Sequence, residues 1–183
     1  MSYLETGILL GVLIVCLHIL GTAIWYGIGP MPSSSLARAT IREMLPQEAK
    51  RICVLGSGWG SLAMDASQTI RDAHVTGIEI SFFPWLFSRL WSSLRRADNL
   101  TLRWKNFHSV SLAEYDLILC YIHRDGMKAL QPKLEAELRD GAYLLSNTFA
   151  VYGWNPIRVE KLRDVWKTRV ILYRFKQAPA PNP

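Results

Sequence analysis

A glycine-rich turn between two apolar segments constrains the fold of this chain more than any other feature. The turn, residues 56–60 (GSGWG), follows a predicted strand over 51–55 (RICVL) and precedes a predicted helix over 61–71. Glycines let a ligand approach the backbone closely, and the start of a helix offers free N–H donors. Glu79 ends the next predicted strand, where a carboxylate can bind both ribose hydroxyls of an adenosine ligand. The pair predicts a nucleotide site; the alternative is a turn that only connects strand to helix.

Strand-like and helix-like segments alternate through the rest of the chain. Further strands are predicted over 73–80, 100–104, 115–122 and 141–147, and further helices over 83–97 and 125–138. This order is typical of a parallel sheet with helices on both faces. The last two strand-like segments, 157–162 and 168–175, have no helix between them and predict an antiparallel hairpin. We therefore expect an α/β fold, a Rossmann-like, mostly parallel sheet with a C-terminal antiparallel hairpin.

The N-terminal region carries an uninterrupted apolar run. Residues 7–29 (GILLGVLIVCLHILGTAIWYGIG) contain no Asp, Glu, Lys or Arg, and all 21 Lys and Arg residues lie at Arg38 or later. A helix of this length spans about 34 Å, enough for a hydrocarbon core of about 30 Å. Because only Glu5 precedes the run and basic residues follow it, we expect a single-pass transmembrane helix with the N-terminus outside and the domain cytoplasmic. The alternative is a buried helix of a soluble core.

The remaining boundaries follow from composition. Residues 30–35 (PMPSSS) form a predicted linker whose serines offer an N-cap to an amphipathic helix over 36–45. A single domain is expected over 36–176, followed by a disordered tail over 177–183. The cysteines and histidines lack metal-ligand spacing, so we expect no metal site, and the wide spacing of the cysteines indicates reduced thiols. The cysteines are Cys16, Cys53 and Cys120.

The spacing of the glycines selects between nucleotide ligands. Dinucleotide folds prefer G-x-G-x-x-G/A, whereas here the last position of that pattern is Ser61 and the glycines run G-x-G-x-G. Together with the terminal hairpin, this spacing resembles the class I S-adenosylmethionine-dependent methyltransferases; a nicotinamide-dependent reductase is the less favoured alternative. The resemblance implies S-adenosylmethionine as cofactor. The residues it implies in binding are Gly56, Ser57, Gly58, Gly60 and, at the ribose, Glu79.

A closer resemblance covers most of the chain after the apolar run. Four segments carry it: VLGSGWGSLA (54–63), GIEISFFPWL (77–86), KNFHSVSL (105–112) and the long stretch 126–156. They resemble the glycine, ribose, adenine and later segments of the small membrane-anchored lysine methyltransferases that modify the ATP synthase c-subunit and the adenine nucleotide translocase. The resemblance implies that Asn106 lies at the adenine. It also implies that the acceptor is a lysine of a membrane protein or another membrane-resident amine.

Two positions depart from that family's pattern. Val54 stands where the family usually has an acidic residue, and Asn106 stands where it usually has Asp. The amide oxygen of Asn106 can still accept a hydrogen bond. Val54 cannot replace a carboxylate, and a lost charge-assisted bond weakens binding by about 1.5–3 kcal/mol. We expect Asp65 to be a solvated helix residue, not a replacement. The departures keep open a second class of function, a non-catalytic methyltransferase-like binding or scaffold protein at the membrane.

Candidates for the acceptor site lie where predicted strands end. Tyr121 is expected to orient an amine and His123 to accept its proton; the alternatives are a packed tyrosine and an exposed histidine. Asn147 and Thr148 are expected to line the same pocket. Residues 149–154 (FAVYGW) form either an aromatic wall or a packed loop. No NPPY-type tetrapeptide is present, which argues against a nucleic-acid amine as acceptor.

A group of basic residues suggests which partner the domain binds. Next to a membrane anchor, attraction to anionic lipid headgroups is favoured over nucleic-acid binding, and a solvated basic face is the plainer alternative. The expected partners are therefore the lipid bilayer and a membrane-protein or membrane-resident small-molecule acceptor. The basic residues are Arg89, Arg95, Arg96, Arg103 and Lys105.

Overall fold

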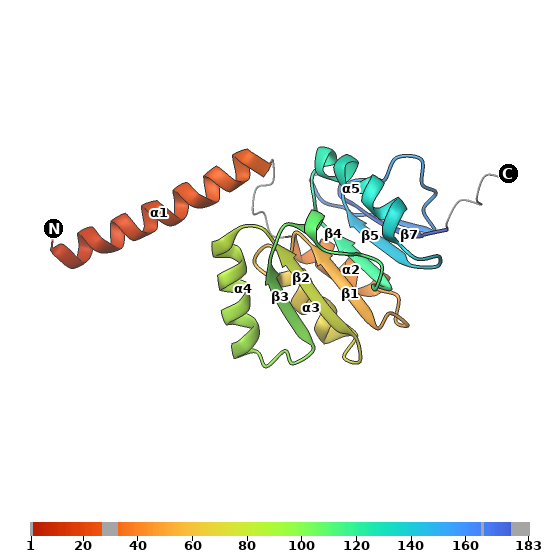
Figure 1. Ribbon diagram of the computed structural model, residues 1–183, viewed down its shortest axis with the longest axis horizontal. Coiled ribbons are helices and arrows are strands. Elements are labelled where there is room, and N and C mark those ends of the chain that lie inside the picture. Colours follow the sequence, from red (N-terminus) through yellow and green to blue (C-terminus); the bar gives the residue numbers. More distant parts are fainter. Residues whose placement is uncertain (1, 27–32, 166, 177–183) are drawn as a thin grey trace.

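A single mixed sheet organises the domain. The computed structural model describes residues 2–26, 33–165 and 167–176 (Figure 1). Within these residues the chain forms a seven-stranded sheet of order β3-β2-β1-β4-β5-β7-β6. The strands are β1 (Arg51–Leu55), β2 (His74–Glu79), β3 (Leu100–Trp104), β4 (Leu117–Cys120), β5 (Tyr143–Asn147), β6 (Arg158–Lys161) and β7 (Arg169–Arg174). The helices are α1 (Tyr3–Tyr26), α2 (Ser35–Met44), α3 (Ser61–Thr69), α4 (Phe82–Leu94), η1 (Phe107–Ser109, a 3-10 turn) and α5 (Arg124–Glu137).

The strand directions confirm the predicted Rossmann-like fold. Strands β1 to β5 run parallel, whereas β7 is antiparallel to both β5 and β6. The later strand of the predicted hairpin lies inside the sheet, next to β5, and β6 forms the edge. Burial explains this choice, because Val170 to Tyr173 of β7 are buried, whereas β6 is largely exposed. The predicted segments match the observed ones to within a few residues, and β1 and β3 match at both ends.

Both faces of the inner strands β1, β2, β4 and β5 are buried, as the continuous apolar strands predict. The side chains of alternate residues of β1 lie on opposite faces of the sheet. Cys53 and Leu55 lie in a cluster with residues of α5, whereas Ile52 and Val54 lie in a second cluster with residues of α2 and α3. Ligands of open α/β sheets bind at the carboxyl ends of the strands, which is where the glycine turn and Glu79 lie.

Asp65 is buried, so the prediction of a solvated helix residue is wrong. It lies on α3, where Arg38 of α2 donates two hydrogen bonds to its carboxylate at 2.6 and 2.8 Å. Arg42 lies 3.2 Å from the same carboxylate. Helix α2 itself begins with the predicted serine cap, since the Ser34 hydroxyl accepts a hydrogen bond from the amide of Ala37. The ion pairs fix α2 across α3, the helix that follows the glycine turn.

Helix α1 extends away from the domain (Figure 1). It is long and apolar enough to cross a membrane over Tyr3–Gly21, and none of that window is buried. The alternative of a buried helix in a soluble core is therefore wrong. The predicted span was 7–29, of which 27–29 lie outside the described residues, as do residues 30–32 of the predicted linker and the predicted tail over 177–183. Among the described side chains, a ring contact joins α1 to the domain: His18 meets Phe83 of α4 edge-on, with centroids 5.1 Å apart.

The thiols differ in their expected reactivity. Cys53 and Cys120 are buried in the sheet, and burial raises the pKa of each to about 12, whereas Cys16 is exposed on α1. Because the thiolate is the reactive form, N-ethylmaleimide at neutral pH is expected to leave Cys53 and Cys120 unmodified in the folded protein and to modify them after unfolding. Mass spectrometry before and after unfolding in urea checks this. Modification of Cys53 or Cys120 without urea would contradict the observed sheet packing.

Candidate active site

The glycine turn is held against the end of β2. The amides of Gly56 and Ser57 both donate to the carbonyl of Ile78 at 3.0 Å, and the amide of Gly60 donates to the carbonyl of Ser57 at 2.9 Å. Gly56, Gly58 and Gly60 all have positive φ (68°, 52° and 84°), a region that residues with a side chain seldom adopt. The three glycines therefore allow the chain to turn tightly from β1 into α3 at the carboxyl edge of the sheet.

Glu79 is the last residue of β2 and lies at this carboxyl edge. Its side chain is nearly buried, at 7% exposure. One carboxylate oxygen accepts a hydrogen bond from the amide of Gly58 at 2.7 Å, and the other accepts one from the amide of Ser81 at 2.8 Å. A carboxylate has about four acceptor positions, so two further donors can still be bound. Glu79 thus joins the glycine turn to the start of α4 and keeps acceptor capacity for a pair of hydroxyl groups.

The surroundings of the glycines fit a bound cofactor. A Cβ placed on Gly58 would meet nothing within 4 Å, so this part of the turn faces open space. A Cβ on Gly60 would lie 2.7 Å from the Cβ of Ser88 on α4. Gly58 therefore lets a ligand approach the backbone, whereas Gly60 lets α4 do so. That Gly58 and Glu79 contact the methionine and ribose parts of S-adenosylmethionine stays a prediction, with which this arrangement agrees.

Replacing Gly60 by alanine is expected to destabilise the domain more than replacing Gly58. Both substitutions place a side chain at positive φ, but only the first also creates a clash with α4. Overpacking of this kind costs about 1–3 kcal/mol, so the Gly60 variant is expected to unfold at correspondingly lower urea. Urea unfolding of the two variants, followed by tryptophan fluorescence, measures the difference. Equal losses of stability would show that α4 moves aside without cost.

The side chains of the other two predicted cofactor residues, Ser57 and Asn106, contact the protein itself. The Ser57 side chain faces inward against Gly77, and its buried hydroxyl has no hydrogen-bond partner among the described residues. The Asn106 amide oxygen, expected at the adenine, accepts a hydrogen bond from the amide of His108 at 2.9 Å and caps η1. Val54 is buried in the apolar cluster beneath α2 and α3. Contact of Ser57 and Asn106 with the cofactor stays a prediction.

Trp104 is a candidate site residue that was not predicted from the sequence. It ends β3, pairs in register with Glu79, and is 54% exposed. Its ring stacks on Trp85 with centroids 6.0 Å apart, and its ring nitrogen donates to the carbonyl of Ile80 at 2.8 Å. An exposed aromatic face beside Glu79 is suited to stacking against a nucleoside base. The available signal was its place at the end of a predicted parallel strand.

Tyr121 and His123 follow β4, next to the glycine turn. The carbonyl of Tyr121 lies 3.5 Å from the point where a Cβ of Gly56 would stand. Tyr121 is half-buried against the apolar cluster beneath α2 and α3. His123 is the N-cap residue of α5, and its Nδ1 is buried without a hydrogen-bond partner among the described residues. The structure thus brings both residues to the carboxyl edge; their catalytic roles stay predictions.

The end of β5 is anchored from a distant part of the chain. The buried Asn147 amide donates to the hydroxyl of Ser33, just before α2, at 3.2 Å. Thr148 follows with φ of 82°, a strained value for a residue with a branched side chain. In the segment 149–154, Val151 is buried and the ring of Trp154 packs on Phe175 with centroids 5.2 Å apart. That segment is therefore at least partly a packed loop.

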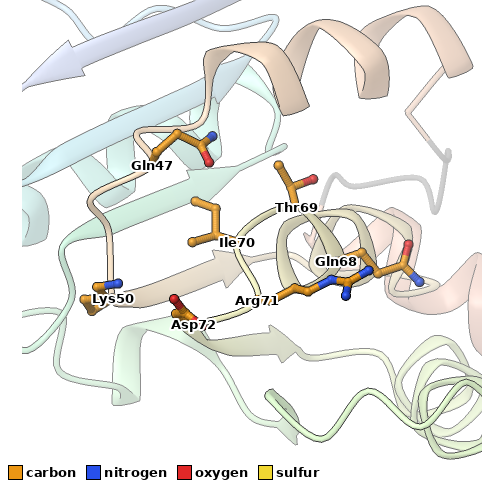
Figure 2. A pocket seen from close by; sticks show the side chains of 7 residues that line it. All are labelled: Gln47, Lys50, Gln68, Thr69, Ile70, Arg71 and Asp72. Atoms are coloured by element: carbon orange, nitrogen blue, oxygen red, sulfur yellow. The ribbon is translucent and has the colours of Figure 1, made fainter.

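A separate depression lies at the opposite edge of the sheet (Figure 2). It has a volume of about 320 Å³ and is open and mostly polar. Lys50 directly precedes β1, and Asp72 precedes β2, so the depression adjoins the amino ends of these strands. Ligands of open α/β sheets bind at the carboxyl ends, and the depression is therefore distinct from the site at Glu79. Its lining residues are Gln47, Lys50, Gln68, Thr69, Ile70, Arg71 and Asp72.

The strand order, the antiparallel β7 and the acidic end of β2 define a class I S-adenosylmethionine-dependent methyltransferase. The chain belongs to the family described by the ANTKMT methyltransferase domain, whose model matches residues 55–158. A curated protein-lysine N-methyltransferase from Saccharolobus islandicus (strain REY15A) is 27% identical over 116 residues, which cover 60% of this chain and 69% of the relative.

Solved structures agree on the fold. An RNA methyltransferase from Salinibacter ruber, in complex with S-adenosyl-L-homocysteine, matches with a TM-score of 0.74 and 21% identity over 83% of this chain and 98% of its own. The m1A22 tRNA methyltransferase TrmK of B. subtilis matches with a TM-score of 0.65 and 15% identity over 80% of this chain and 68% of its own. The family match makes the protein an S-adenosylmethionine-dependent enzyme, which disfavours the scaffold and reductase alternatives.

Proposed function

We propose that this protein is a membrane-anchored protein-lysine N-methyltransferase that modifies a membrane protein or another membrane-resident amine. One observation carries the choice of a lysine: the curated relative that matches 60% of this chain is a protein-lysine N-methyltransferase. The family match over residues 55–158 includes the glycine turn, Glu79 and the end of β4.

The residues at the carboxyl edge suit transfer to an amine. S-adenosylmethionine supplies an electrophilic methyl group on a sulfonium sulfur. Lysine reacts through its neutral amine, whose lone pair forms the N–C bond as the S–C bond breaks. In the proposed roles, His123 accepts the proton that the ammonium form must lose, and Tyr121 orients the nitrogen. Glu79 and the glycine turn hold the other reactant in line, and such positioning supplies much of the rate enhancement.

Helix α1 supports the proposed anchor. Its apolar side chains are exposed nearly all round, as in Leu13 at 53%, and a helix of this kind is stable in lipid rather than in water. The basic residues that follow α1 favour a cytoplasmic domain with the N-terminus outside. An anchor raises the local concentration of the domain at membrane-resident acceptors.

The acceptor is tested with the full chain in lipid vesicles, a membrane-protein extract and S-adenosylmethionine labelled in the methyl group. We expect label in methylated lysine after acid hydrolysis. His123→Ala is expected to lower the rate by about 10²–10⁴-fold, with the matched control His74→Ala, an exposed histidine at the start of β2, unchanged. Label in RNA would refute the proposal, and label in lipid would replace the lysine by another membrane-resident amine as the acceptor. Cofactor binding without any transfer would favour the scaffold function.

The anchor is tested separately by extraction of membranes at alkaline pH. The wild-type chain is expected to stay with the membrane. Ile14→Arg adds a charge near the middle of α1, which disfavours insertion by about 2.5–3.5 kcal/mol, and is expected to release part of the protein. A Ser2→Cys variant is expected to react with an impermeant maleimide from the outer side. Full release of the wild-type chain, or reaction only from the cytoplasmic side, would contradict the anchor or its direction.

A further inference from the structure

Helix α4 presents a continuous apolar line to the outside. Phe83, Phe87, Leu90 and Leu94 are spaced by four, three and four residues, so they lie on one side of the helix. The last three are 51%, 60% and 84% exposed. The opposite side, with Pro84, Ser88 and Ser92, is buried against the domain. We refer to these four residues as the α4 stripe.

Two arginines adjoin the α4 stripe. Arg89 directly precedes Leu90, and Arg95, the C-cap residue of α4, directly follows Leu94; both arginines are exposed. Each guanidinium lies over an aromatic ring: Arg89 over Trp85 at 5.6 Å and Arg95 over Trp91 at 5.8 Å. The helix contains no acidic residue. An apolar stripe between aromatic rings and cations is the pattern of a helix that lies in the headgroup region of an anionic bilayer.

The position of α1 agrees with that placement. Figure 1 shows α1 leaving the domain beside the N-terminal end of α4 and running across the direction of α4. The contact between His18 and Phe83 joins the two helices there. With α1 across the bilayer, α4 therefore lies along its surface. Trp25 lies near the end of the apolar run, where tryptophan favours the headgroup level. His18 precedes it by seven residues, about 10 Å along a helix axis. This distance agrees with the depth of about 5–10 Å to which interfacial helices bury their apolar face.

We infer that α4 is a second membrane contact: the α4 stripe enters the acyl boundary of an anionic bilayer, and Arg89 and Arg95 bind lipid phosphates. The orientation of this contact rests on the proposed anchoring by α1. Nucleic acid is the less suitable partner of the arginines, because the exposed aliphatic side chains of Leu90 and Leu94 would stay in water on a phosphate backbone.

The contact places the active site at the membrane surface. Phe87 of the α4 stripe meets Trp59 of the glycine turn edge-on, with centroids 5.4 Å apart. Gly60 of the turn abuts Ser88, and Glu79 binds the amide of Ser81 at the start of α4. Docking of α4 therefore fixes the height of the glycine turn above the lipid. The acceptor amine is expected to be one that a membrane protein or lipid presents close to the headgroups.

Fluorescent labels in the full chain test the inference. In a Cys16→Ser background, Leu90→Cys receives an environment-sensitive fluorophore, and the protein is placed in phosphatidylcholine vesicles with or without phosphatidylglycerol. We expect a blue-shifted emission that lipid-borne spin labels quench, more strongly with the anionic lipid. A matched label at Val165→Cys, 91% exposed and beyond the opposite edge of the sheet, is expected to stay in water. The native Cys16, labelled in the wild-type chain, reports on the insertion of α1.

The outcomes separate the two claims. A Leu90 label in water beside a Cys16 label in lipid would overturn α4 docking and keep the anchor, whereas both labels in water would overturn both. A Leu90 label that responds to added RNA and not to lipid would overturn the lipid contact in favour of nucleic acid. Arg89→Gln and Arg95→Gln are each expected to lower the docked fraction in anionic vesicles about fivefold. The control, Lys128→Gln on α5, is expected to leave it unchanged.

Discussion

Glu79→Ala is expected to weaken the binding of S-adenosylmethionine by roughly 10²- to 10⁴-fold. The nearly buried carboxylate at the end of β2 has acceptor positions left for two ribose hydroxyls. Each charge-assisted hydrogen bond contributes about 1.5–3 kcal/mol, and every 1.4 kcal/mol changes affinity about tenfold. The substitution also frees the amide of Gly58, which loosens the turn that faces the ligand. Calorimetric titration of the full chain in detergent measures the loss.

Two further variants, one conservative and one a matched control, test whether the loss of affinity comes from the Glu79 carboxylate. Glu79→Gln keeps one acceptor oxygen without the charge and is expected to bind with intermediate affinity. Glu114→Ala removes a carboxylate that forms a surface ion pair with Arg51 at the other edge of the sheet, and its affinity is expected to equal that of the wild type. Circular dichroism checks that each variant is folded. If a folded Glu79→Ala protein bound the cofactor normally, the ribose would have to be held elsewhere.

The second large effect is expected in stability and arises from Asp65. Replacing both Arg38 and Arg42 by alanine leaves this carboxylate buried without a cation, which costs about 3–5 kcal/mol. Asp65→Ala is expected to cost less, because the Arg38 side chain is 31% exposed and that of Arg42 is 42% exposed, so both reach water. Urea unfolding of the full chain in detergent, followed by near-ultraviolet circular dichroism, compares the variants.

A triple variant tests whether the unpaired charge of Asp65 causes this loss of stability. Adding Asp65→Ala to the double arginine variant removes the unpaired buried charge, so it is expected to recover part of the lost stability. A triple variant less stable than the double one would show that Asp65 contributes mainly through other contacts. Because α3 starts at the glycine turn and α2 crosses α3, a loss here is also expected to weaken cofactor binding. The ion pairs thus connect stability with function.

The sequence was most informative where local chemistry settles the structure. The apolar run of β4 and the glycines at positive φ follow from backbone and burial rules that act within a few residues. The glycine turn and Glu79 were predicted to form one nucleotide site, and in the structure they join through a hydrogen bond of 2.7 Å. The family resemblance was confirmed over residues 55–158.

The prediction for Asp65 failed because its partners lie 27 and 23 positions earlier, on another helix. A charged residue near the start of a helix is usually solvated, and only the crossing of α2 over α3 buries this one. Trp104 was missed for a similar reason, since its value as a nucleoside surface depends on its register with Glu79 across two strands. Neither arrangement leaves a periodic or spacing signal in the chain.

The sequence by itself determined the alternation of strands and helices, the glycine turn, the acidic end of β2 and the apolar N-terminal run, because each depends on neighbouring residues. Only the tertiary structure decided the rest: the insertion of β7 between β5 and β6, the burial of Asp65, and the exposure of the α4 stripe beside α1. These features depend on which surfaces meet in space. Packing between distant segments sets that choice, and it determines which side chains remain to bind cofactor, acceptor and lipid.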